Sequence, residues 1–67
     1  MIALTINGEP RHFEETLTAA QLIERLELTG KRIALERNGQ IVPRGQFADE
    51  RLADGDRLEI VVAVGGG

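Results

Sequence analysis

Residues 57–67 of the chain read RLEIVVAVGGG, in which an apolar run over residues 60–64 is followed by three glycines. Successive side chains of a β-strand point to opposite faces, so every second residue shares a face. In a strand over residues 57–64, one face would carry only aliphatic side chains, namely Leu58, Ile60 and Val62. The other face would carry Val61 and Ala63, which are almost as apolar. A strand with two apolar faces is predicted to lie at the centre of its sheet or to expose an apolar surface.

The glycines that follow Val64 predict a flexible tail. Because glycine has no Cβ, Gly65 and Gly66 could thread a channel that a side chain would block. The terminal carboxylate of Gly67 is the chemically distinctive group at this end. We interpret residues 1–64 as one folded domain and residues 65–67 as a tail that presents this carboxylate to enzymes. The alternative is a frayed terminus without a function, since chain ends are commonly disordered.

The beginning of the chain predicts a β-hairpin. Residues 1–6 alternate between apolar and small or polar side chains, which indicates a strand with one buried face. Asn7-Gly8 favours a tight turn with positive φ, and a returning edge strand is expected over residues 11–14. His12 lies on that strand without other ligands at a metal-like spacing. We therefore interpret His12 as a solvated strand residue.

A helix is predicted over residues 19–27. Thr18 and Gln21 have the spacing of a capping box, in which each side chain bonds to a backbone N–H of the first turn. The apolar side chains recur at helical spacing and predict one buried stripe, formed by Leu22, Ile23 and Leu26. Gly30 is expected to terminate the helix in a left-handed conformation.

A second hairpin is predicted after the helix. Its strands are expected over residues 33–37 and 40–44, joined by the turn sequence Asn38-Gly39. Pro43 cannot donate to a strand ladder, so it indicates an edge or a strand end. The following segment has no period, and Phe47 and Leu52 are expected to anchor it to the core. The order of these elements predicts an α+β fold, a β-grasp (ubiquitin-like) roll with four to five strands and one main helix.

The composition excludes several classes of protein. The chain has 67 residues, 42% hydrophobic residues and a net charge of -3, with acidic and basic residues interspersed. Nucleic acids and anionic membranes favour a basic patch, so neither is an expected partner. The absence of cysteine excludes a side-chain thiolate and a CxxC metal site. Without an apolar segment near the roughly 18 residues of a membrane span, and without a signal-peptide pattern, a cytoplasmic location is expected.

The outer face of the last strand is the predicted docking surface for a partner. Exposed apolar patches often mark interfaces. The residues assigned to this surface are Val61, Ala63, Val64, Ala3 and Phe13. The alternative is an ordinary scatter of surface hydrophobic residues.

Three segments together carry a resemblance to a known family. They are RNGQIVPR at residues 37–44, DGD at residues 54–56, and the terminal AVGGG at residues 63–67. With the early Asn7-Gly8 turn and the helix in their expected places, the whole chain resembles the sulfur carrier proteins of thiamine biosynthesis, the ThiS family. The third glycine, Gly65, departs from that pattern and leaves the final Gly66-Gly67 unchanged.

The resemblance implies a role as a protein substrate of other enzymes. A ThiF-like enzyme would use MgATP to adenylate the Gly67 carboxylate. Sulfur from a persulfide donor, such as a cysteine desulfurase, would then give a thiocarboxylate for a ThiG-like thiazole synthase. The chain itself has no GxxxxGK[ST] loop and no Ser-His-Asp set, which agrees with a carrier that binds no cofactor or metal.

Two other classes of function remain open from the residues alone. The chain could be a carrier in another pathway, such as the small subunit of molybdopterin synthase or a ubiquitin-like modifier joined to lysines through Gly67. It could also be a passive interaction domain. Replacement of one oxygen by sulfur on the intact chain would indicate a sulfur carrier, and slow-migrating conjugates would indicate a modifier.

Overall fold

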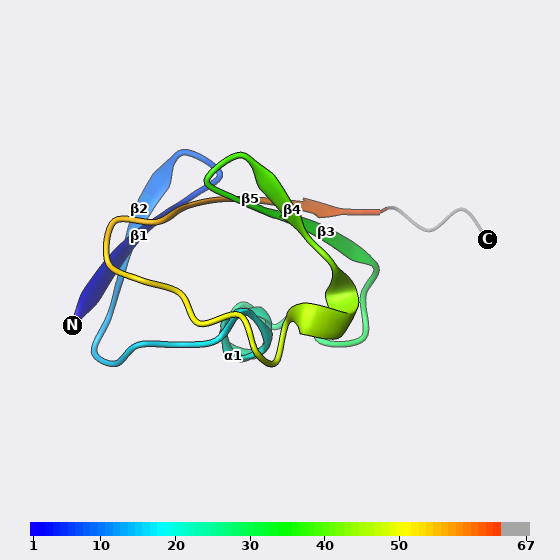
Figure 1. The fold of residues 1–67 in the computed structure, drawn as a ribbon, viewed down its shortest axis with the longest axis horizontal. Coiled ribbons are helices and arrows are strands. Elements are labelled where there is room, and N and C mark those ends of the chain that lie inside the picture. Colours follow the sequence, from blue (N-terminus) through cyan, green and yellow to red (C-terminus); the bar gives the residue numbers. More distant parts are fainter. Residues whose placement is uncertain (64–67) are drawn as a thin grey trace.

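Five strands form a mixed sheet in residues 1–63, the part of the chain that the computed structural model describes (Figure 1). The strands are β1 (Ile2–Ile6), β2 (Glu9–Phe13), β3 (Ile33–Arg37), β4 (Gln40–Val42) and β5 (Arg57–Val62). Their order across the sheet is β2-β1-β5-β3-β4. β5 runs parallel to β1 and antiparallel to β3, while the other pairs are antiparallel hairpins. This arrangement is the predicted β-grasp fold, with β5 in the predicted central position.

The first hairpin follows the alternation of its sequence. The buried side chains of β1 are Ile2, Leu4 and Ile6. Asn7 and Gly8 adopt positive φ values of 51° and 83°, as the turn requires. β2 is an edge strand that begins earlier than predicted, because Pro10 pairs opposite Thr5 within the ladder. At an edge, the missing N–H of a proline faces away from the sheet and leaves no ladder bond unmade.

Helix α1 (Ala19–Arg25) is shorter than predicted. The capping box is confirmed, with the Thr18 hydroxyl accepting from the N–H of Gln21 at 3.2 Å and the Gln21 side chain accepting from the N–H of Thr18 at 2.9 Å. The prediction that Gly30 ends the helix is wrong. Glu27 takes the left-handed conformation at φ 60°, and the N–H of Leu28 bonds to the carbonyl of Ile23 at 3.0 Å, so the helix ends in a Schellman motif before Gly30. No helix in residues 1–63 is long and apolar enough to span a membrane.

One face of the sheet packs on α1 and on the loop that follows the second hairpin (Figure 1). That loop contains a 3-10 helix, η1 (Arg44–Gln46), and it covers the core with Phe47 and Leu52, as predicted. The largest fully buried side chains are Leu4, Leu22, Leu35, Leu52 and Leu58. Each such burial contributes about 1.5–3 kcal/mol to folding. In residues 1–63, no helix covers the opposite face of the sheet (Figure 1).

Candidate functional site

β5 carries the chain toward its C-terminus at one end of the sheet. Its ladder with β3 runs from Arg37 opposite Leu58 to Ile33 opposite Val62. The N–H of Ala63 adds one more bond, to the carbonyl of Arg32 at 2.9 Å. The predicted reactive group, Gly67, and the other tail residues, Val64, Gly65 and Gly66, lie outside the described residues. Their assignments stay predictions.

Two asparagine side chains fix β5 from its two neighbours. Asn7, at the end of β1, accepts from the N–H of Ile60 at 2.7 Å and donates to the carbonyl of Ile60 at 3.1 Å. Asn38, at the end of β3, accepts from the N–H of Arg57 at 2.9 Å. Both side chains leave Asn-Gly turns in which the asparagine has φ 51°. In each turn the same asparagine supplies the positive φ and a side chain that hydrogen-bonds to the main chain of β5.

The outward face of the sheet presents apolar side chains near the end of β5. Val61 is 64% exposed and Ile41 on β4 is 65% exposed. Ala34 on β3 is exposed and pairs with Val61. We call Ala34, Ile41 and Val61 the outer patch. Glu36 and Glu59, which pair with each other, lie on the same face beside it.

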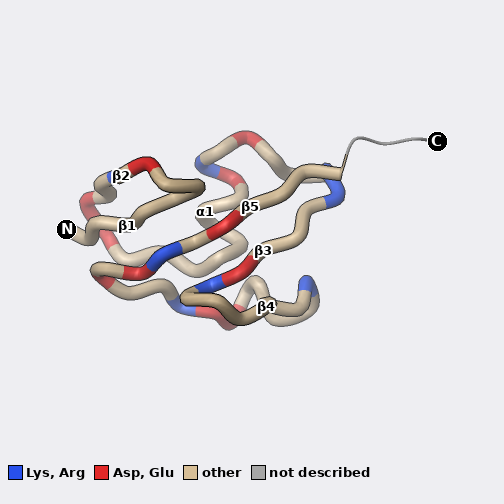
Figure 2. The backbone as a smooth tube through the Cα atoms, turned by 90° about the horizontal axis from the view of Figure 1, so that it is seen from above, with Lys and Arg blue, Asp and Glu red and all other residues tan. Residues whose placement is uncertain are grey.

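Two residues assigned to the docking surface lie elsewhere. Phe13 pairs with Ile2, whose side chain is buried, and Phe13 itself packs partly buried against the core. Opposite residues of an antiparallel pair share a face, so Phe13 faces inward. Ala3 faces outward, but its carbonyl accepts from the N–H of Gly55 at 2.7 Å, before β5 begins. Ala3 precedes the short overlap of β1 with β5 and Val61 follows it, so the two residues lie toward opposite ends of the sheet. Figure 2 shows β5 running away from the N-terminal end of β1.

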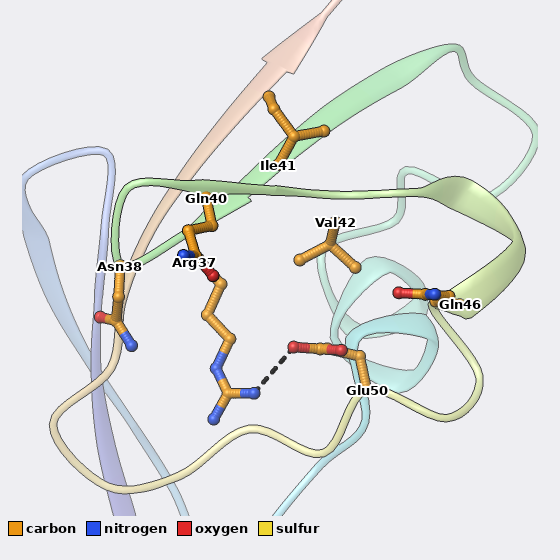
Figure 3. Close-up of a pocket in the computed structure, with 7 residues that line it drawn as sticks. All are labelled: Arg37, Asn38, Gln40, Ile41, Val42, Gln46 and Glu50. Atoms are coloured by element: carbon orange, nitrogen blue, oxygen red, sulfur yellow. Dashed lines mark hydrogen bonds and ion pairs between the residues drawn. The ribbon is translucent and has the colours of Figure 1, made fainter.

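A polar network joins β3 to the loop before β5. Arg37 donates through Nε to Asp56 at 2.8 Å. It also donates through Nη1 to Glu50 at 2.8 Å (Figure 3). Asp56 is buried and also accepts from the N–H of Ala53 at 2.8 Å and from Asn38 Nδ2 at 3.0 Å. Burial alone would raise the pKa of the Asp56 carboxyl, but the hydrogen bonds from Ala53, Asn38 and Arg37 lower it below its ordinary value.

This network borders a polar hollow of about 280 Å³ that also involves Gln40 and Gln46. Figure 3 shows Arg37 and Glu50 directed toward each other within it, while Ile41 and Val42 point to opposite sides of β4. Because both carboxylates already accept from Arg37, the network is a structural tie between β3 and the loop. The RNG sequence signalled the turn here. It gave no sign of the ion pairs, since Glu50 and Asp56 are distant in the chain.

In the described part of the chain, no three His, Asp or Glu side chains gather in a way that could hold a metal ion. His12 is exposed on β2, where the sequence had placed it as a solvated strand residue. The residues that distinguish this end of the molecule are therefore those that position β5 and those of the outer patch.

Comparison with known proteins gives a consistent assignment. Residues 4–67 match the model of the ThiS family. The sulfur carrier protein ThiS of Bacillus subtilis is 34% identical over 65 residues, which cover 96% of this chain and 98% of that protein. The crystal structure of a thiamine biosynthesis protein (ThiS) from Geobacter metallireducens superposes with a TM-score of 0.83 at 30% identity, and covers 98% of this chain and 100% of the other.

Two relatives are much longer than this chain. A thiazole synthase of Paramagnetospirillum magneticum is 44% identical over 64 residues, and another, of Magnetococcus marinus, is 36% identical over 62 residues. The matched segment is 20% of the first and 19% of the second. The family match, the full-length B. subtilis relative and the Geobacter structure together establish that this chain belongs to the ThiS family of β-grasp proteins.

Proposed function

We propose that this chain is a sulfur carrier for thiazole formation in thiamine biosynthesis and that Gly67 is the group that carries the sulfur. The observation that supports this most directly is the match to the ThiS family over residues 4–67, which includes the Gly-Gly end. The B. subtilis sulfur carrier protein, similar over nearly its whole length, supports the same role. In this role the chain is a protein co-substrate and its partners supply the catalysis.

The chemistry of a carboxylate determines the first step. A carboxylate is a poor acyl donor, because it is anionic and would have to expel oxide. A ThiF-like enzyme with MgATP would convert the Gly67 carboxylate to an acyl-adenylate and release pyrophosphate. A persulfide, supplied directly or indirectly by a cysteine desulfurase, would then displace AMP to form an acyl disulfide. Cleavage of that S–S bond by a thiol would leave the thiocarboxylate.

The last step transfers the sulfur to a thiazole synthase. Two relatives named thiazole synthases contain a segment similar to this chain within a longer polypeptide. Joining a carrier and its acceptor in one chain raises their effective concentration. This arrangement supports a thiazole synthase as the physiological acceptor of the separate chain.

The fold supports delivery of the tail from a fixed position. β5 is held by a strand on each side and by Asn7 and Asn38. A tail that begins at such a strand starts from a defined point and direction, which reduces the ordering cost of entering a partner's active site. Gly65 and Gly66 would then pass where a Cβ would collide.

Intact-mass spectrometry tests the proposal. The chain is incubated with a ThiF-like enzyme, MgATP and a persulfide donor, and the expected product is heavier by the difference between one sulfur and one oxygen atom. A chain without Gly66-Gly67 is the control and should show no mass change and no ATP–pyrophosphate exchange, while retaining its circular dichroism spectrum. Full exchange by the truncated chain would refute the assignment of Gly67. Conjugates to lysine in place of sulfur transfer would instead indicate a modifier.

A further inference from the structure

On the side that faces β1, the C-terminal end of β5 has no neighbouring strand within residues 1–63. The ladder between β1 and β5 contains the pairs Thr5–Arg57 and Ile6–Leu58 and then stops. Asn7 extends it by one rung, because its side chain bonds to both main-chain polar groups of Ile60. β5 continues beyond that rung to Val62.

The register with β3 determines where the polar groups of Val62 point. The backbone N–H of Asn38 donates to the carbonyl of Arg57, and the N–H of Ala63 donates to the carbonyl of Arg32. The odd-numbered residues of β5 therefore direct their N–H and C=O groups toward β3. In an antiparallel ladder the intervening residues direct their N–H and C=O groups to the opposite side. For Val62 that side is the β1 side, past Asn7. Within residues 1–63, no hydrogen bond pairs these two groups on that side.

An apolar groove lies beside this open edge. Its volume is about 370 Å³. Its aliphatic lining comes from β1, β5 and the end of α1, namely Ile6, Leu26, Leu28, Ile60 and Val62. Glu9 and Arg11 on β2 add one charge of each sign to its wall. An unpaired strand edge above an apolar groove has the two elements of strand-addition binding, in which main-chain bonds give affinity and a pocket takes alternate side chains.

We propose that a thiazole synthase adds an extended segment alongside β5 at Val62 and places an apolar side chain of that segment in the groove. This inference rests on the proposed function. The choice of a thiazole synthase comes from the relatives that join a similar segment to a synthase. The main-chain groups of Val62 would bond to the added strand, and the strand would then lead along the chain toward Gly67. The contact would hold the tail extended at the entrance to the acceptor's active site.

Amide hydrogen exchange at Val62 distinguishes this contact from docking on the outer patch. The N–H of Val61 lies on the β3 side, where Val61 pairs with Ala34, whereas within residues 1–63 the N–H of Val62 has no hydrogen-bond partner. With a ¹⁵N-labelled chain, the Val62 amide should exchange rapidly alone and about tenfold or more slowly in the complex, because exchange requires opening of the hydrogen bond. Binding with an unchanged Val62 rate would overturn the proposal. Protection that grows with the concentration of the chain alone would assign the edge to a second copy and overturn it equally.

Three altered chains complete the test. A synthetic chain with an ester in place of the Val61–Val62 amide should bind the synthase more weakly, because it lacks the Val62 N–H that would donate to the added strand. The ester carbonyl of Val61 is also a weaker acceptor on the β3 side, so a small loss of melting temperature is expected, and binding is measured where both chains are folded. Val62→Asp should weaken binding about tenfold by placing a charge in the groove. Ile41→Asp, on the outer patch, is the matched control and should bind unchanged. Equal losses for the two aspartate variants, or none for Val62→Asp, would refute the groove.

ATP–pyrophosphate exchange with a ThiF-like enzyme separates the inference from the proposed function. If the parent chain supports exchange but its Val62 amide is not protected by the synthase, the carrier role stands and the proposed strand contact is refuted. A chain that fails in exchange removes the carrier role itself.

Discussion

Replacement of Arg37 by methionine is expected to lower the free energy of unfolding by about 2–3 kcal/mol. Methionine keeps most of the aliphatic stem and removes both ion pairs. The pair with Asp56 is the stronger, because the Asp56 side chain is only 9% exposed and a hydrogen bond to a charged group contributes about 1.5–3 kcal/mol. Glu50 is 26% exposed, so water replaces much of that contact and its share is below about 1 kcal/mol.

The loss should stay under the 3–5 kcal/mol that is typical of a broken buried ion pair. Asp56 retains two donors in the variant, the N–H of Ala53 and the side chain of Asn38. The carboxylate therefore remains partly satisfied. By this reasoning Arg37→Met is a destabilised but folded protein.

The effect of pH follows from the lowered pKa of Asp56. A carboxyl group with a lowered pKa in the folded state contributes stability above its unfolded pKa, near 3.9, and loses it as the pH falls through the folded pKa. Arg37 is one of the groups that lower this pKa, after Ala53 and Asn38. The difference in stability between the parent and Arg37→Met should thus be full near neutral pH and shrink as the pH falls below about 4.

Urea denaturation followed by far-UV circular dichroism measures the free energy of unfolding at each pH, since the chain has no Trp or Tyr for fluorescence. Arg57→Met is the matched control, because Arg57 is exposed and forms no ion pair within residues 1–63. Its stability should change by less than about 0.5 kcal/mol. A loss for Arg37→Met no larger than that of the control, or one that does not depend on pH, would refute the reasoning.

Three further predictions concern the tail, the outer patch and the helix end. Gly66→Val should slow ATP–pyrophosphate exchange with little change in melting temperature, and a variant that reacts as fast as the parent would show that passage does not require glycine. Val61→Asp should weaken binding to the ThiF-like enzyme by about 1–3 kcal/mol in a calorimetric titration, a typical loss at the centre of an interface, and unchanged binding by a folded variant would exclude the outer patch. Glu27→Gly should raise the free energy of unfolding by about 0.5 kcal/mol, because relief of left-handed strain exceeds the added entropy of the unfolded chain, and a lower urea midpoint would contradict this.

Local patterns predicted the elements of the fold because each pattern has a local physical cause. Alternation gave the buried face of β1, and the Thr18–Gln21 spacing gave the start of α1. The helix end was mispredicted for a related reason. Gly30 has the lowest intrinsic cost at positive φ, yet Leu28 secures the earlier ending through its bond to Ile23, and the left-handed position then falls on Glu27.

The composition of the candidate surfaces depended on register, which local patterns do not encode. Alternation correctly placed Val61 and Ala3 on the outward face. It could not show that β1 and β5 overlap by only two residue pairs, which separates Ala3 from Val61 along the sheet. The pairing of Phe13 with Ile2 likewise turns Phe13 toward the core. Ile41 belongs to the outer patch, but β4 has only three residues, too few for an alternating pattern to indicate its exposed face.

The same short overlap connects the turn sequences to the proposed chemistry. Parallel pairing over two residues would leave the last part of β5 supported from the β3 side alone. Asn7 compensates by bonding through its side chain to both main-chain polar groups of Ile60, from a turn position where its φ is 51°. A shorter polar side chain would not span both groups of Ile60, and a longer β1 would cover Val62. The Asn-Gly turn therefore fixes the direction of β5 while leaving its final residue open to a partner.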